Sequence, residues 1–138
     1  MKAYILGGLV AVGMMLAAGQ TAAHHSFAAE FDANKPIKLT GVVTKIEWTN
    51  QHVWFYINVK DEQTGDVTNW GAEMGPPHGL QRQGWRRDSL KIGESVTLTG
   101  SLAKNGSKRV NARNVTLTAT GGKPGQTLDA VSSQRTNP

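Results

Sequence analysis

Four histidines are the residues in this sequence whose type best suits metal binding: His24, His25, His52 and His78. Neutral imidazole is a common ligand of Cu(II) and Zn(II), so we treat all four as candidate metal ligands. Glu73 and Asp32 are candidate oxygen donors to the same ion. Spacing alone does not bring these residues together, and the alternative is that they are scattered surface side chains.

His24 stands out because of where the mature protein is expected to begin. A positive start at Lys2, an uncharged apolar run over residues 3–18 and a small, polar stretch ending at Ala23 are typical of a secretory signal. We therefore expect residues 1–23 to be cleaved, and the mature protein to be periplasmic or secreted without a membrane span. The alternative is a retained anchor, although a span needs about 20 apolar residues. Cleavage would leave His24 with a free α-amine, which chelates copper together with the imidazole.

A second candidate site is aromatic and basic. It consists of Trp48, Trp54, Tyr56, Trp85, Arg86 and Arg87. Aromatic rings flanked by basic residues form stacking platforms for single strands or sugars. In an exported protein we expect a glycan, a peptide or a planar cofactor as the ligand, and no nucleic acid. The alternative is that these rings fill the core or cover the rim of the fold.

Composition narrows the remaining possibilities. The 138 residues carry a formal net charge of +5, which fits either a mixed-sign surface or an anionic partner. The absence of cysteine excludes disulfides, thiolate metal sites and thiol nucleophiles. No paired-carboxylate pattern, Gly-rich phosphate loop or His-Glu-x-x-His motif occurs, so we expect the protein not to be an enzyme.

A predicted β-hairpin over residues 51–74 positions most of these side chains. Val53, Phe55 and Ile57 alternate with Trp54 and Tyr56, which places the first set in the core and the two aromatic rings on the other face. The turn signal of the hairpin is the run of polar and glycine residues that follows its first strand.

The rest of the chain predicts short strands and one helix. Residues 37–48 are rich in β-branched side chains, and their imperfect alternation around Gly41 predicts a bulge. Residues 78–85, after a Pro pair, predict a short helix, and two further strands are expected over 95–102 and 109–117. Three strands, a helix and two strands is the order of a five-stranded Greek-key OB-like barrel. The expected class is all-β with small α content, and the alternative is an open antiparallel sheet or sandwich.

These elements give the expected division of the chain. After the signal peptide we expect an N-terminal arm over residues 24–36, an OB-like domain over 37–118, and a disordered tail over 119–138. The tail prediction depends on its low apolar content, which offers too little buried surface to offset the entropy of ordering.

The sequence resembles a family of small exported bacterial proteins classified only as a domain of unknown function. The resemblance covers nearly all of the predicted mature chain before the tail and depends on five motifs: His24-His25-Ser26-Phe27, Gly41-Val42-Val43 with Trp48-Thr49-Asn50-Gln51-His52, Glu73-Met74-Gly75, Gly84-Trp85, and Asn111-Ala112-Arg113. Where the family has Asn-Pro-His, this chain has Asn50-Gln51-His52 and lacks the rigidity of that proline. The resemblance implies export and a small β domain, and it implies no activity.

The residues therefore predict an exported, non-enzymatic binding module. In one hypothesis it binds copper or another divalent metal through the mature N-terminal histidine. In the other it is a periplasmic adaptor or ligand-binding protein that uses the aromatic and basic face of the barrel. The partner is accordingly a metal, a small ligand or a periplasmic protein.

Overall fold

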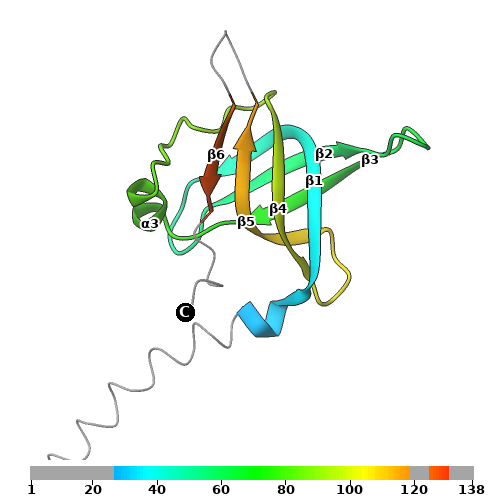
Figure 1. Ribbon diagram of the computed structural model, residues 1–138, viewed down its shortest axis with the longest axis horizontal. Helices are drawn as coiled ribbons and strands as arrows, with labels where there is room; N and C mark the ends of the chain where they lie inside the picture. The colour runs from blue at the N-terminus through cyan, green and yellow to red at the C-terminus, as the bar shows by residue number, and fades with distance from the viewer. Residues whose placement is uncertain (1–26, 119–124, 131–138) are drawn as a thin grey trace, which may run out of the picture.

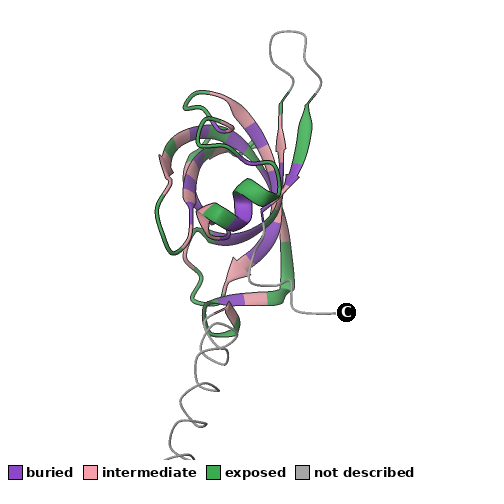
Figure 2. Ribbon diagram, turned by 90° about the vertical axis from the view of Figure 1, so that its left-hand side faces the viewer, coloured by how far each residue is buried: buried purple, intermediate pink, exposed green. Residues whose placement is uncertain are grey.

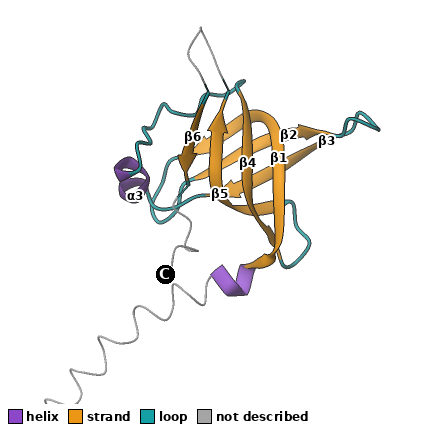
Figure 3. Cartoon of the chain, viewed as in Figure 1, coloured by secondary structure: helices purple, strands orange, loops and turns teal. Residues whose placement is uncertain are grey.

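The structure is a computed structural model that describes residues 27–118 and 125–130. This part of the chain is mostly β, as predicted, with a little helix (Figures 1 and 3). A helical turn over residues 27–30 precedes β1 (Phe31–Glu47), β2 (Trp54–Lys60), β3 (Val67–Glu73), α3 (Pro77–Arg82), β4 (Ser95–Ala103), β5 (Arg109–Leu117) and β6 (Gln126–Asp129). Three predicted regions lie outside the described ranges: the signal peptide (residues 1–23), the histidines His24 and His25, and residues 119–124 and 131–138 of the tail.

The strands form one sheet in the order β3-β2-β1-β4-β5-β6, and a further parallel pairing joins β3 to β5. This pairing sets Gly71 beside Arg109 and Glu73 beside Asn111. As a result, each strand from β1 to β5 has a hydrogen-bonded neighbour on both sides. Viewed from the α3 side, the strands curl round, and α3 lies across the opening that they surround (Figure 2).

The predicted alternation in β2 is confirmed. Val53, Phe55 and Ile57 have no exposed surface, whereas Trp54 and Tyr56 are half-buried on the opposite face. Burying a side chain of this size contributes about 1.5–3 kcal/mol. The same hairpin therefore supplies core residues on one face and two aromatic rings on the other.

β1 is long because it pairs with two neighbours in succession. Its first part pairs with β4 and its last part with β2, and Val42 faces a partner in both. At Gly41 a Cβ atom would lie 2.5 Å from the carbonyl oxygen of Asn58, so the missing side chain permits the close approach of β2. The register of β1 against β2 shifts between Val43 and Lys45, so the irregularity that was predicted around Gly41 lies further along β1.

The helix and the start of the domain differ from prediction only in their bounds. α3 begins at Pro77, as is common for a proline in the first turn, and it ends before Trp85. β1 already begins at Phe31, which pairs with Ala103, so the last part of the predicted arm belongs to the sheet. Among the residues that the structure describes, no helix has both the length and the apolar character to cross a membrane.

The prediction of a disordered tail was wrong for residues 125–130, because β6 extends the sheet there. Leu128 and Ala130 are buried, and the indole Nε1 of Trp85 donates a hydrogen bond of 2.7 Å to the Asp129 carbonyl. The Gly75 N–H also donates to the Ala130 carbonyl at 2.9 Å. A few tertiary contacts thus hold a segment whose local composition favours disorder.

Candidate functional site

His52, Glu73 and Asn111 form a polar cluster on the outer face of the sheet. Asn111 Nδ2 donates a hydrogen bond of 3.0 Å to Glu73 Oε1, and His52 Nδ1 lies 3.4 Å from the same oxygen. The parallel pairing of β3 with β5 sets Glu73 directly beside Asn111, and His52 lies just before β2, the other neighbour of β3. Residues from three separate motifs of the family resemblance therefore meet at one carboxylate.

Burial controls the electrostatics of this cluster. The Glu73 side chain is only 10% exposed, and this burial raises the pKa of its carboxyl group. The negative charge of Glu30 acts in the same direction. Interactions with His52, Asn111 and Arg109 oppose the effect and lower the pKa of Glu73. Burial and Glu30 thus disfavour the charged form of this carboxyl group, and His52, Asn111 and Arg109 offset only part of that effect.

The His52 ring turns its Nδ1 towards Glu73. Nδ1 lies 3.4 Å from Glu73 Oε1, which makes an ion pair when the ring is protonated. In the neutral tautomer with its hydrogen on Nδ1, Nε2 has a free lone pair. The side chain of His52 is 36% exposed, so part of the ring faces solvent. The arrangement of amide, carboxylate and imidazole is the one that commonly orients a histidine ligand towards a metal ion.

The start of the described chain is held close to this cluster. Phe27 and Phe31 stack with their ring centroids 5.8 Å apart, and Phe31 is buried. Lys104 holds the helical turn over residues 27–30 in place. Its backbone N–H donates a hydrogen bond of 2.8 Å to the Glu30 carbonyl, and its ammonium group donates to the Ala28 carbonyl. The side chain of Glu30 lies close enough for its charge to raise the pKa of Glu73.

The other predicted metal ligands are not brought to the cluster within the described residues. His78 lies exposed on α3, and Asp32 accepts a hydrogen bond of 2.9 Å from the Asn34 N–H. No group of three or more potential ligands that could hold a metal ion occurs within residues 27–118 and 125–130. A closed metal site would therefore need ligands from outside these ranges.

Trp54 and Tyr56 lie side by side on the outer face, above Gly71. A Cβ atom at Gly71 would lie 3.2 Å from Tyr56 Cε1 and 3.6 Å from Trp54 Cζ3, so the glycine makes room for both rings. The Arg109 guanidinium group lies 4.4 Å from the centroid of the Trp54 ring, a cation–π contact. Of the predicted aromatic set, these two rings share one surface.

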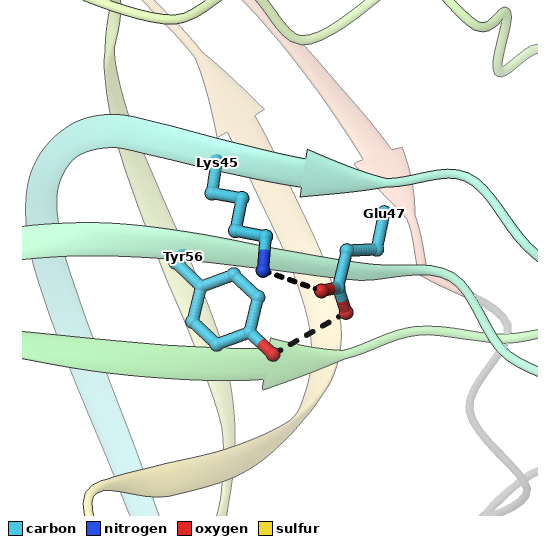
Figure 4. Close-up of polar contacts among 3 residues, drawn as sticks. All are labelled: Lys45, Glu47 and Tyr56. Carbon is cyan, nitrogen blue, oxygen red and sulfur yellow. Dashed lines mark hydrogen bonds and ion pairs between the residues drawn. The ribbon is translucent and has the colours of Figure 1, made fainter.

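Tyr56 also belongs to a polar network at the edge of this surface (Figure 4). Lys45 Nζ lies 2.7 Å from Glu47 Oε1, and the Tyr56 hydroxyl donates a hydrogen bond of 3.4 Å to Glu47 Oε2. The hydrogen bond with Lys45 lowers the pKa of Glu47, and the same bond raises the pKa of Lys45. The lysine ammonium group also lies 5.4 Å from the centroid of the tyrosine ring.

The remaining predicted ligand-binding residues have other positions. Trp85 is 1% exposed and belongs to the core, so its predicted contact with a ligand was wrong. Trp48 is partly buried against the same core. Arg86 and Arg87 are exposed, and Arg86 Nε lies 3.8 Å from Asp88 Oδ1.

Sequence reasoning missed two residues that contact these sites. Arg109 replaces the predicted arginines beside Trp54, and Asn111 supports Glu73. Both contacts depend on the register of the pairing between β3 and β5, which the strand pattern does not specify. The family resemblance does include Asn111, and this was the available indication.

The raised pKa of Glu73 predicts that the melting temperatures of the protein and of its Glu73→Gln variant differ by an amount that depends on pH. Both are measured with a metal chelator present. A carboxyl group with a raised pKa stabilises the fold most below its unfolded value of 4.5, and this contribution is lost as the pH rises through the folded pKa. We therefore expect the variant to melt a few degrees above the wild type at pH 8, with the difference shrinking towards pH 4.5.

Thermal unfolding by circular dichroism between pH 4.5 and pH 8 measures this difference. Glu62→Gln is the matched control, because Glu62 lies exposed between β2 and β3 and the substitution removes the same charge. An equal pH trend in the two variants would show that net charge, not burial of Glu73, is responsible.

Two comparisons bear on the identity of the chain. No curated protein matches it. Residues 12–112 match the model of a family described as a family of unknown function, DUF6152. This confirms the resemblance to a domain of unknown function, and the match covers the segments that contribute His52, Glu73 and Asn111. The chain belongs to the DUF6152 family.

Proposed function

We propose that the protein is an exported, non-enzymatic binding module built on an OB-like, five-stranded Greek-key barrel. The return of the strand pairings from β1 through β2, β3, β5 and β4 to β1 supports this fold, as does the position of α3 between β3 and β4. An open sheet or a sandwich would lack the pairing of β3 with β5. The leader over residues 1–23 supports export to the periplasm or beyond.

The function that the site supports best is binding of one copper ion by His52 and the mature N-terminus. The observation that carries this proposal is the contact of His52 Nδ1 with Glu73 Oε1, at 3.4 Å, with Glu73 held in turn by a hydrogen bond of 3.0 Å from Asn111. Such a chain leaves Nε2 of a neutral imidazole as a directed ligand. An ordinary surface histidine has no such support.

The N-terminal histidines are within reach of this ligand. His24 precedes the helical turn over residues 27–30 by three residues, which cover at most about 10 Å when extended, and the turn adds about 1.5 Å per residue. Glu30 in turn lies close enough to Glu73 to influence its titration. The α-amine and imidazole of His24, with His25 beside it, can therefore approach His52.

Nitrogen ligands of this kind favour copper over other divalent ions. An amine and two imidazoles suit Cu(II), which also stands highest in the general affinity order of the divalent first-row metals. Zn(II) is the next candidate for the same ligands. In this proposal Glu73 and Asn111 orient His52 and do not bind the ion.

Titration of the exported protein with Cu(II) and Zn(II) tests the proposal. The N-terminal residue is first identified by mass spectrometry, and affinity is then measured by calorimetry against a competing chelator. We expect one Cu(II) per chain with nanomolar or tighter affinity. His52→Ala removes a ligand and should weaken binding by at least about 100-fold, whereas Glu73→Gln removes only its orientation and should cost about tenfold.

Two further variants make the test specific. His78→Ala removes an exposed histidine on α3 and should leave the affinity unchanged. One alanine added before His24 should weaken binding, because it displaces the α-amine from the chelate. A mature terminus other than His24, or equal losses from His78→Ala and His52→Ala, would reject the copper proposal.

A second candidate function is ligand binding on the surface of Trp54 and Tyr56, with Arg109 in the place expected for Arg86 and Arg87. The favouring observation is the pair of rings above Gly71 with a guanidinium group 4.4 Å from the Trp54 centroid. A glycan, a peptide or a planar cofactor could stack there after displacing the cation. Trp54→Ala should abolish such binding and leave copper affinity intact.

A further inference from the structure

A pocket of about 230 Å³ lies beside the turn that joins β4 to β5. Its lining includes Lys35, Ile37, Trp70, Leu102, Lys104 and Lys108. These residues come from β1, β3, β4 and the turn itself. The pocket shares no lining residue with the cluster of His52, Glu73 and Asn111, so it is a separate feature of the molecule.

The floor of the pocket is apolar. Ile37, Trp70 and Leu102 are partly buried and pack against the main core, which leaves one side of each available to the pocket. Small-molecule sites usually combine such an apolar surface with a few polar groups that fix orientation. With a volume below the usual range of ligand pockets, this one fits only a compact molecule.

The rim of the pocket is positively charged. Lys35, Lys104 and Lys108 are exposed, and no acidic residue belongs to the lining. The Lys108 ammonium group lies 5.1 Å from the centroid of the Trp70 ring. Lys104 donates one hydrogen bond to the Ala28 carbonyl and keeps its charge and two further N–H groups. Three like charges around one opening favour an anion there.

A third observation is an unsatisfied hydroxyl group in the same lining. The Oγ atom of Ser107 is buried and has no hydrogen-bond partner within the described structure. Buried polar atoms are normally paired, so an unpaired one at the wall of a pocket indicates a missing acceptor or donor. A phosphate or carboxylate oxygen that reached this hydroxyl group could accept its hydrogen bond.

From these three observations we infer that the pocket binds a compact amphiphilic anion: a phosphate group joined to a small aromatic or alkyl body. The apolar body lies on Trp70 and Ile37, and the phosphate lies among the lysines with Ser107 as a further donor. This chemistry occurs in free organic phosphates and in lipid headgroups. The inference does not depend on the copper proposal.

Phenyl phosphate is the probe that tests the inference. Its binding is followed by the shift of the Trp70 indole ¹H–¹⁵N signal, assigned with a Trp70→Phe variant. Because both halves of the ligand contribute, we expect phenyl phosphate to bind at least about tenfold more tightly than inorganic phosphate or benzyl alcohol. Lys108→Gln should weaken the binding about fivefold or more, since it removes a charge-assisted contact.

The matched control is Lys60→Gln, which removes an equal charge from the exposed end of β2 and should leave the affinity unchanged. Dihexanoyl phosphatidic acid serves as a second probe: tighter binding than phenyl phosphate assigns the site to lipid headgroups, and weaker binding assigns it to free organic phosphates. Equal affinity for phenyl phosphate and inorganic phosphate, or equal losses in the two lysine variants, would overturn the inference.

Discussion

Truncation of Trp85 to Ala is expected to lower the free energy of unfolding by about 3–5 kcal/mol, the usual cost of removing a large buried aromatic side chain. Trp85 is 1% exposed and joins the main core to β6. Its ring packs in the main core, and its indole N–H donates to Asp129 in β6. The loss therefore combines a cavity with the removal of the hydrogen bond from the indole to the Asp129 carbonyl.

Urea unfolding followed by circular dichroism measures this loss. Trp85→Phe keeps most of the packing but removes the hydrogen bond to Asp129, and should cost only about 1–2 kcal/mol. Trp48→Ala is the comparison for a partly buried indole at the edge of the same core. Equal losses for Trp85→Ala and Trp48→Ala would contradict the position of Trp85 in the core.

Gly100→Ala is expected to be destabilising by about 3 kcal/mol or more, at the upper end of what overpacking costs. A Cβ atom at Gly100 would lie 2.2 Å from the carbonyl oxygen of Asn111 and 3.0 Å from its carbonyl carbon. Backbone atoms in a paired strand cannot turn aside as a side chain can, so β4 and β5 would have to separate at this point. The shift would also move Asn111 away from Glu73.

Gly71→Ala provides a milder control for this prediction. The nearest atom to a Cβ there is Tyr56 Cε1, at 3.2 Å, and a half-buried ring can move. Comparison of the two variants by urea unfolding separates a backbone collision from a side-chain contact. If Gly100→Ala were as stable as Gly71→Ala, the close approach of the two strands would be refuted.

Much of the fold was predictable because the pattern of each strand reflects its own burial. The alternation around Phe55 follows directly from the two faces of β2, and the strands expected over residues 95–102 and 109–117 match β4 and β5 to within one residue. β6 was not predictable in this way. Its stability comes from Leu128 and from contacts with Trp85 and Gly75, which are distant in the sequence.

The candidate sites were predictable only as sets of residue types. His52 and Glu73 were recognised as possible ligands. Their contact depends on the pairing of β3 with β2, which brings Glu73 next to the residues just before β2. Arg109 was missed because nothing in its local sequence indicates that a parallel pairing will place it over Trp54. Trp85 was assigned to a surface because indole rings are common both in cores and on binding faces.

The small size of β6 has a consequence for the behaviour of the protein at high concentration. A strand with one free edge presents unpaired backbone groups to which a strand of another molecule can add. Among the described strands, β6 has β5 as its single neighbour, and it is four residues long. Such a short edge offers few hydrogen bonds to a second molecule. The fold thereby limits edge-to-edge aggregation without disulfides.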